Sequence, residues 1–157
     1  MNQTDGSLVL GEADAGEILT LQRAAYVTEA QLHGDLRMPP LAQSLPELLA
    51  ELADPDVTAF GYREAGRLVA AVRVRILGPV ARIGRLCVVP DLQGRGLGTA
   101  LLNAVHARLP AEVTRIELFT GEHSAANLRL YARLGYVETH RQDLGGYQLV
   151  FMSRSRR

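Results

Sequence analysis

The sequence contains no lysine, and all 17 of its basic residues are arginine. A Walker-A phosphate loop, Schiff-base catalysis and the ATP site of a protein kinase each need a lysine, so these three classes are excluded. The 17 basic residues balance 17 acidic ones, which leaves no net charge to attract nucleic acid or an anionic membrane. We therefore expect no partner of either kind.

Cysteine is almost as scarce. Cys87 is the only one, so the chain forms no intramolecular disulfide and no zinc site built on several thiolates. Its apolar neighbours predict a small buried side chain rather than a nucleophile. The histidines His33, His106 and His140 lack the spacing of metal ligands, so we expect no metal.

Long apolar runs are also absent. No stretch approaches about 18 consecutive apolar residues, and the polar N-terminal segment does not have the apolar core of a signal peptide. We expect a cytoplasmic protein. With 157 residues, of which 47% are hydrophobic, the composition suits one globular domain over residues 1–157.

The spacing of apolar residues predicts the element order β-α-α-β-β-β-α-β-α-β-β. Apolar stripes of helical period occupy 18–32, 48–52, 97–109 and 128–134. Asp14 is a candidate cap of the first helix, and Ser44 with Glu47 forms a capping box for the second. Strands are predicted at 8–10, 57–63, 68–77, 80–89, 116–120, 136–141 and 148–153. The prolines Pro39 and Pro40 predict irregular structure over 34–43.

This order indicates an α+β domain with a mixed, mostly antiparallel sheet of about seven strands. A β-α-β unit lies near its middle, and helices cover both faces.

Residues 86–102 read as a strand, a glycine-rich loop and a strong helix. Gly94, Gly96 and Gly98 allow backbone N–H groups to approach a ligand, and the helix start adds partial positive charge. Arg95 adds a full charge with a donor fork suited to phosphate. The glycine spacing G-x-G-x-G does not match the dinucleotide-binding pattern G-x-G-x-x-G. The segment therefore predicts an anion site of another kind.

Gln93, Gly96 and Gly98, after Val88-Val89-Pro90, resemble the pyrophosphate loop of the GNAT superfamily of N-acetyltransferases. A second segment, with Asn127, Tyr131 and Gly135-Tyr136, is similar to the other signature of that family. The resemblance runs from about Val57 to the C-terminus, and the predicted order of elements agrees with it.

The resemblance implies that acetyl-CoA is the cosubstrate. The backbone of Cys87, Val88 and Val89 would pair with the pantetheine arm like an added strand, and the N–H near Val88 would polarise the thioester carbonyl. Asn127 would bond the pantetheine, and Tyr131 at the sulfur would stabilise or protonate the leaving thiolate. The pyrophosphate would be held by the amides of Gln93, Gly94, Arg95, Gly96, Leu97, Gly98 and Thr99.

One position departs from the family pattern. Many members carry a glutamate, the general base, where this chain has Arg82, and an arginine cannot accept the proton. Glu29, Glu117, Glu122, His123 or a chain of water molecules remain as candidates. If Arg82 faces the cleft, the acceptor carries a carboxylate or phosphate. The apolar residues of 36–41 lie where the family builds its acceptor site.

We therefore expect direct transfer of an acetyl group to a primary amine, on a small molecule or a peptide N-terminus, in a ternary complex. Two alternatives stay open: a non-catalytic acyl-CoA-binding regulatory module, and an N-acyltransferase that uses a longer acyl donor. A homodimer through the C-terminal strands is compatible with the resemblance.

Overall fold

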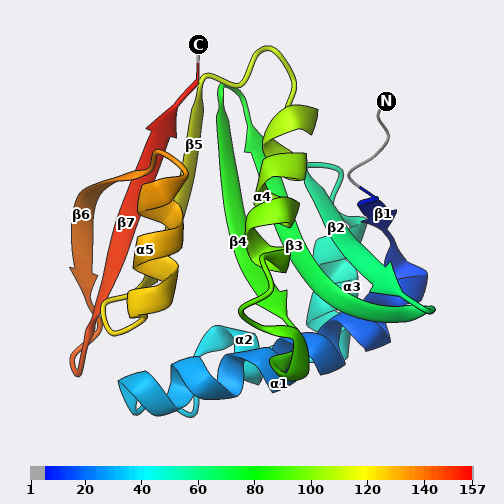
Figure 1. The fold of residues 1–157 in the computed structure, drawn as a ribbon, viewed down its shortest axis with the longest axis horizontal. Helices are drawn as coiled ribbons and strands as arrows, with labels where there is room; N and C mark the ends of the chain where they lie inside the picture. Colours follow the sequence, from blue (N-terminus) through cyan, green and yellow to red (C-terminus); the bar gives the residue numbers. More distant parts are fainter. Residues whose placement is uncertain (1–5, 157) are drawn as a thin grey trace.

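The structure, a computed structural model, describes residues 6–156. Residues 1–5 lie outside the described residues, and with them most of the segment used above to argue against a signal peptide. Seven strands form one sheet in the order β1-β2-β3-β4-β5-β7-β6 (Figure 1). Their bounds are β1 Leu8–Leu10, β2 Val57–Glu64, β3 Arg67–Leu77, β4 Val80–Val88, β5 Arg115–Gly121, β6 Val137–Asp143 and β7 Gln148–Ser155. All neighbouring pairs are antiparallel except β4–β5. The predicted α+β class is confirmed.

Helices cover both faces of the sheet, with α4 and α5 on one face and α1, α2 and α3 on the other (Figure 1). Their bounds are α1 Ala15–His33, α2 Pro39–Ala42, α3 Leu45–Ala53, α4 Leu97–Arg108 and α5 Ala125–Arg133. The short helix α2 shows that the prediction of irregular structure for 34–43 was wrong. Its two prolines occupy the first two helical positions, where no intrahelical N–H partner is needed, so they begin the helix instead of breaking it.

The core lies on both sides of the central strand β3. Val69 and Val72 are at most 1% exposed, and so are Leu101 of α4 and Ile18 of α1 on the two covering layers. Burial of such side chains contributes about 1.5–3 kcal/mol each. Within residues 6–156, no helix has the length and apolar character needed to cross a membrane.

The strands β4 and β5 pair over a very short distance. Only Val80–Arg82 and Arg115–Glu117 are in register, and beyond them the two strands diverge (Figure 1). One edge of β4 therefore lacks a neighbouring strand over most of its length, and its backbone groups on that edge need other partners.

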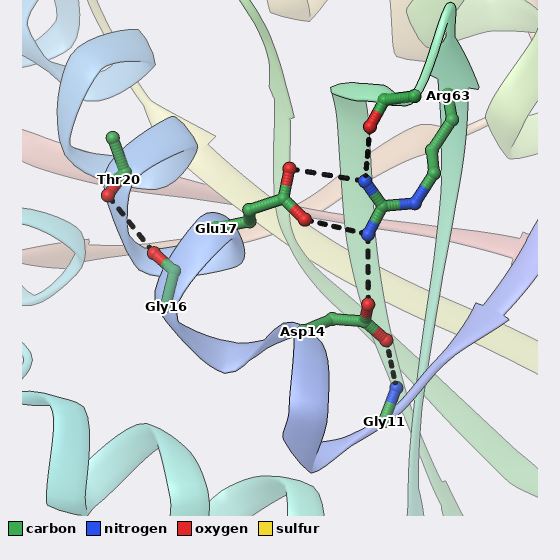
Figure 2. Close-up of polar contacts among 7 residues, drawn as sticks. Gly11, Asp14, Gly16, Glu17, Thr20 and Arg63 are labelled. Atoms are coloured by element: carbon green, nitrogen blue, oxygen red, sulfur yellow. Dashed lines mark hydrogen bonds and ion pairs between the residues drawn. The ribbon is translucent and has the colours of Figure 1, made fainter.

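Arg63 of β2 fastens the start of α1 to the sheet (Figure 2). Its guanidinium donates to Asp14 at 2.9 Å and to both carboxylate oxygens of Glu17 at 2.8 and 3.1 Å. Asp14 occupies the N-cap position as predicted, but its side chain makes no capping bond there and accepts instead from the Gly11 amide at 2.8 Å. The capping box of Ser44 and Glu47 is confirmed, with bonds of 3.2 and 2.8 Å.

The Arg63 cluster predicts a pH-dependent contribution to stability. Hydrogen bonding to Arg63 lowers the pKa of Glu17, so its contribution is present above the ordinary glutamate pKa and is lost as the pH falls through the lowered value. We expect Arg63→Gln to reduce the free energy of unfolding near pH 7, with the difference from wild type shrinking toward pH 3. Chemical denaturation across this range measures it. Arg129 is exposed and has no ion pair in the described chain, so Arg129→Gln is the control. Its free energy of unfolding should depend on pH as that of wild type does.

Candidate functional site

A cavity of about 430 Å³ opens where β4 and β5 part. Its lining comes from α1, the end of β4, the glycine loop with the start of α4, and α5 with its N-cap Ser124. Nine of the residues predicted to bind the cosubstrate line it: Cys87, Val88, Gln93, Gly94, Gly96, Leu97, Gly98, Thr99 and Asn127. The glycine loop and the second signature, some 30 residues apart in the chain, therefore lie on one cavity.

The glycine loop forms an anion-binding end of this cavity. Gly94 and Gly96 have φ angles of 81° and 83°, in the left-handed region that favours glycine, and Gly96 is the N-cap of α4. The amides that follow it have no intrahelical partner, and the helix dipole adds positive charge there. No acidic side chain in the first turn of α4 offsets that charge. Before the loop, Arg67 holds Asp91 through two bonds of 2.8 and 2.9 Å.

The free edge of β4 forms a second wall. The amide of Val89 donates to Val69 of β3 at 2.9 Å, so the backbone groups of Val88 point the opposite way, into the cavity. The side chain of Gln93 donates to the Val88 carbonyl at 3.1 Å, which agrees with this direction. Tyr26 of α1 donates in the same way to the Leu86 carbonyl at 3.1 Å. These side chains satisfy carbonyls and leave the Val88 N–H directed at the cavity.

A carboxylate closes the side formed by α1. Among the described residues, Glu29 is the only acidic one in the lining. The Ser124 hydroxyl donates a short hydrogen bond to its carboxylate. Burial, and then the Glu29 charge, raise the pKa of Tyr131. Burial likewise raises the pKa of Tyr26, with smaller effects from Cys87 and Tyr131. The cavity thus has a cationic end and a separate acidic wall backed by two neutral phenols.

Three of the predicted site residues lie outside the lining. Val89 and Tyr131 are each 5% exposed, and the Tyr131 ring packs edge-on against Tyr136 with centroids 6.0 Å apart. Among residues 6–156 the Tyr131 hydroxyl has no hydrogen-bond partner. Arg95 is exposed at the tip of the loop. Asn127 does line the cavity, and its amide donates to Thr120 of β5 at 3.3 Å.

Comparison with known proteins identifies this architecture. The model of the acetyltransferase (GNAT) family matches residues 20–136. The chain belongs to this family. The resemblance seen in the sequence is confirmed, and N-acetyl transfer is the activity of the family to which the motifs pointed.

Three known proteins illustrate what the chain is similar to. It is 27% identical to the S-(2-succino)cysteine N-acetyltransferase of Bacillus subtilis, over 93% of each chain. It is 30% identical to the UPF0157 protein YqkA of Bacillus subtilis over 78% of its own length, but spans only 34% of that longer relative. The PaiA N-acetyltransferase of Thermoplasma acidophilum, solved in complex with coenzyme A, superposes with a TM-score of 0.76 at 16% identity, over 96% of this chain and 99% of the other.

In this GNAT domain the side chain of His33, the histidine clamp, holds in place the side of the cavity that carries Glu29. His33, at the end of α1, has Nδ1 2.8 Å from the Glu29 carbonyl and accepts at Nε2 from the His123 amide at 3.0 Å. Since a carbonyl only accepts, both contacts require the neutral imidazole with its proton on Nδ1. The ring also packs against Tyr147, whose hydroxyl donates to Asp35 at 2.7 Å. The clamp joins α1 to the β5–α5 loop and to the β6–β7 hairpin.

The other candidate bases lie elsewhere. Glu117 pairs with Arg82 at 3.3 Å and with Arg115 at 2.9 Å, at a second cavity of about 380 Å³ on the paired part of β4 and β5. Glu122 accepts from the Gln148 amide at 2.7 Å, and His123 bonds His33 through its backbone. Arg82 lines that second cavity, not the first. The segment 36–41 lines neither cavity, and Leu36 is 79% exposed.

Sequence reasoning did not single out Tyr26, Ser124 or Arg133, all of which line the main cavity. Tyr26 and Glu29 are three residues apart on one helix face, which is a spacing that most helices contain. Ser124 follows a strand in a polar turn, and Arg133 resembles any exposed helical arginine. No local pattern marks these residues, because only the fold brings them to the cavity.

The clamp makes Gly121 of β5 a sensitive position. A Cβ at Gly121 would overlap the His33 imidazole, which is only 9% exposed and held by two hydrogen bonds. We expect Gly121→Ala to reduce stability by about 1–3 kcal/mol, the usual cost of overpacking. Thermal and chemical denaturation measure this. Gly84→Ala on β4, where a Cβ meets no atom within 4 Å, is the matched control, and an equal loss in both variants would contradict the assignment.

Proposed function

We propose that the protein transfers the acetyl group of acetyl-CoA to a primary amine, on a small molecule or a peptide N-terminus, by direct attack in a ternary complex. The observation that carries the proposal is one cavity with an anion-binding helix start, an open strand edge and a single carboxylate. The relative that acts on S-(2-succino)cysteine supports a small-molecule amine as the acceptor class.

Acetyl-CoA binding uses the backbone. The pyrophosphate lies on the amides of the loop from Gln93 to Thr99, with Arg95 and Arg133 adding charge at the mouth. The pantetheine pairs with the free edge at Val88, flanked by Cys87 and Val89, and Asn127 bonds it from α5. The Val88 N–H polarises the thioester carbonyl and stabilises the oxyanion that forms there.

The proton passes from the amine to the leaving sulfur through Glu29 and Tyr131. Glu29 takes a proton from the amine as its nitrogen attacks the thioester carbon, and the C–S bond then breaks. Burial is the larger cause of the raised pKa of Tyr131 and the Glu29 charge the smaller one, and only the smaller effect ends when Glu29 is protonated. The phenol therefore becomes a better acid as the thiolate leaves. Tyr131 gives its proton to sulfur and regains one from Glu29, so no net charge accumulates.

Two variants test this relay. Glu29→Gln and Tyr131→Phe should each lower kcat about 10²- to 10³-fold, the range for loss of one general acid or base, while acetyl-CoA binds as in wild type. Release of free thiol with a panel of amines measures kcat, and calorimetry measures binding. Glu17→Gln, the same change on the exposed part of α1, is the control. Binding of acetyl-CoA without thiol release from any amine would indicate a non-catalytic module and contradict the proposal.

Gly96 tests the cosubstrate site. Alanine at φ 83° is strained and turns the loop amides away from a bound anion. We expect Gly96→Ala to weaken coenzyme A binding at least tenfold by calorimetry. Gly66→Ala, at φ 82° in the β2–β3 hairpin, carries the same strain far from the cavity and should leave the Kd unchanged. Equal Kd values for all three proteins would count against the assignment.

A further inference from the structure

Arg85 of β4 has an unusual backbone conformation. Arg73 pairs with Gly84 and Ala71 with Cys87, so β4 takes three steps where β3 takes two, which defines a bulge. Arg85 lies in this bulge with a φ of 56°. Ala65, in a hairpin turn, is the only other non-glycine residue with positive φ in the described chain. Such a conformation costs about 1 kcal/mol or more and redirects the side chain.

Arg85 acts electrostatically on Tyr26 of α1 and on Arg73, which donates to Gln22 of α1, so we assign its side chain to the face of the sheet under α1. Its Nε is buried without a hydrogen-bond partner. Within residues 6–156, the guanidinium makes no hydrogen bond or ion pair. Arg85 is in the lining of neither cavity, but its charge acts on Tyr26 and Cys87, which both line the main one.

A more deeply buried guanidinium, that of Arg73, lies near Arg85. Arg73 is 4% exposed, donates to Gln22 and Gln43 at 2.9 and 3.1 Å, and lies 3.0 Å from a carboxylate oxygen of Glu51. Burial and the Arg85 charge lower the pKa of Arg73, whereas Glu51 raises it. Of these two arginines, only Arg73 is paired with a carboxylate, that of Glu51. Arg85 is partly buried and has no such partner in the described chain, so its guanidinium is available to bind an anion.

The position of Arg85 relates that anion to the reaction. Ile83 lines the second cavity and Leu86 the main one, so Arg85 lies on β4 between the two. Three residues separate it from Val88, which is at most about 10 Å along a strand. An acceptor whose amine meets Glu29 near Val88 can therefore place a second group at Arg85 only if it is small.

We propose that Arg85 determines acceptor specificity by binding an anionic oxygen group of a small amine. This inference rests on the proposed N-acetyltransferase function. The acceptor is then a compound with an amine and an oxyanion a few bonds apart, of which amino carboxylates are the simplest class. A guanidinium binds a carboxylate or phosphate through two parallel N–H···O bonds, which fixes the orientation of the amine. Arg82, which is already paired with Glu117, is not needed for this role.

Matched acceptors test the proposal without any variant. Amino acids, their primary carboxamides and aminoalkyl phosphates of similar length are compared by thiol release with saturating acetyl-CoA. We expect kcat/KM of an anionic member to exceed that of its amide at least tenfold, and the better anion identifies carboxylate or phosphate. Amides that react as well as acids would overturn the inference while leaving the N-acetyltransferase intact. Absence of thiol release from every amine would instead reject the proposed function.

Variants of Arg85 give a second test. Arg85→Gln should raise KM for the preferred acid 10- to 100-fold, with KM for acetyl-CoA and kcat/KM for neutral amines unchanged, and Arg85→Lys should restore part of the loss. Because Arg85 makes no hydrogen bond or ion pair in the described chain, Tm of Arg85→Gln should not fall. Arg75→Gln is the control, since Arg75 is next but one to Arg73 on β3 and is already paired with Asp54 at 2.7 Å. An equal loss for acids and neutral amines would contradict a role in specificity.

Discussion

The site depends on the separation of β4 from β5 after three residue pairs. A longer parallel pairing would satisfy the edge of β4 with β5 and leave no space for a ligand. Two features keep the strands apart. The bulge at Arg85 shifts the register of β4 just beyond the paired part, and the imidazole of His33 packs against Gly121 at the far end of β5. The carbonyls left without strand partners are satisfied by Tyr26 and Gln93, which stabilises the open form.

This separation also arranges the charges. The helix start at Gly96 presents backbone dipoles to one end of the cavity, an arrangement that suits an anion and needs no lysine. The carboxylate of Glu29 faces the same cavity from another layer of the fold, across from that cationic end. Keeping the two apart matters, because a carboxylate at the start of α4 would repel a phosphate there. The two ends therefore suit a large anionic cosubstrate and an amine at the same time.

The sequence predicted the elements that local pattern controls. The order of helices and strands along the chain, the capping box at Ser44 and the glycine loop all depend on residues close to each other in the sequence. The acidic wall could not be predicted, since Glu29 and Ser124 are 95 positions apart and meet only in the fold. Arg82 shows that a strand can be predicted locally while the contacts of its side chains cannot. Its strand position was read correctly, but its pairing with Glu117 depends on which part of β4 still touches β5. The prolines of α2 were misjudged because their effect depends on helix position, not on their presence.

The buried thiol of Cys87 bears on how the acetyl group travels. Its side chain lies against the cavity, and a thiolate there would be a natural site for a covalent acyl intermediate. Burial raises the pKa of Cys87 to about 12, and the nearby cations Arg73 and Arg85 only partly oppose this. Near neutral pH the thiol therefore stays protonated and is a poor nucleophile. Its Sγ instead faces the Ala71 carbonyl at 3.8 Å, toward β3 and away from the open edge. A protonated Cys87 that faces β3 therefore favours direct attack by the acceptor amine over a covalent acyl intermediate.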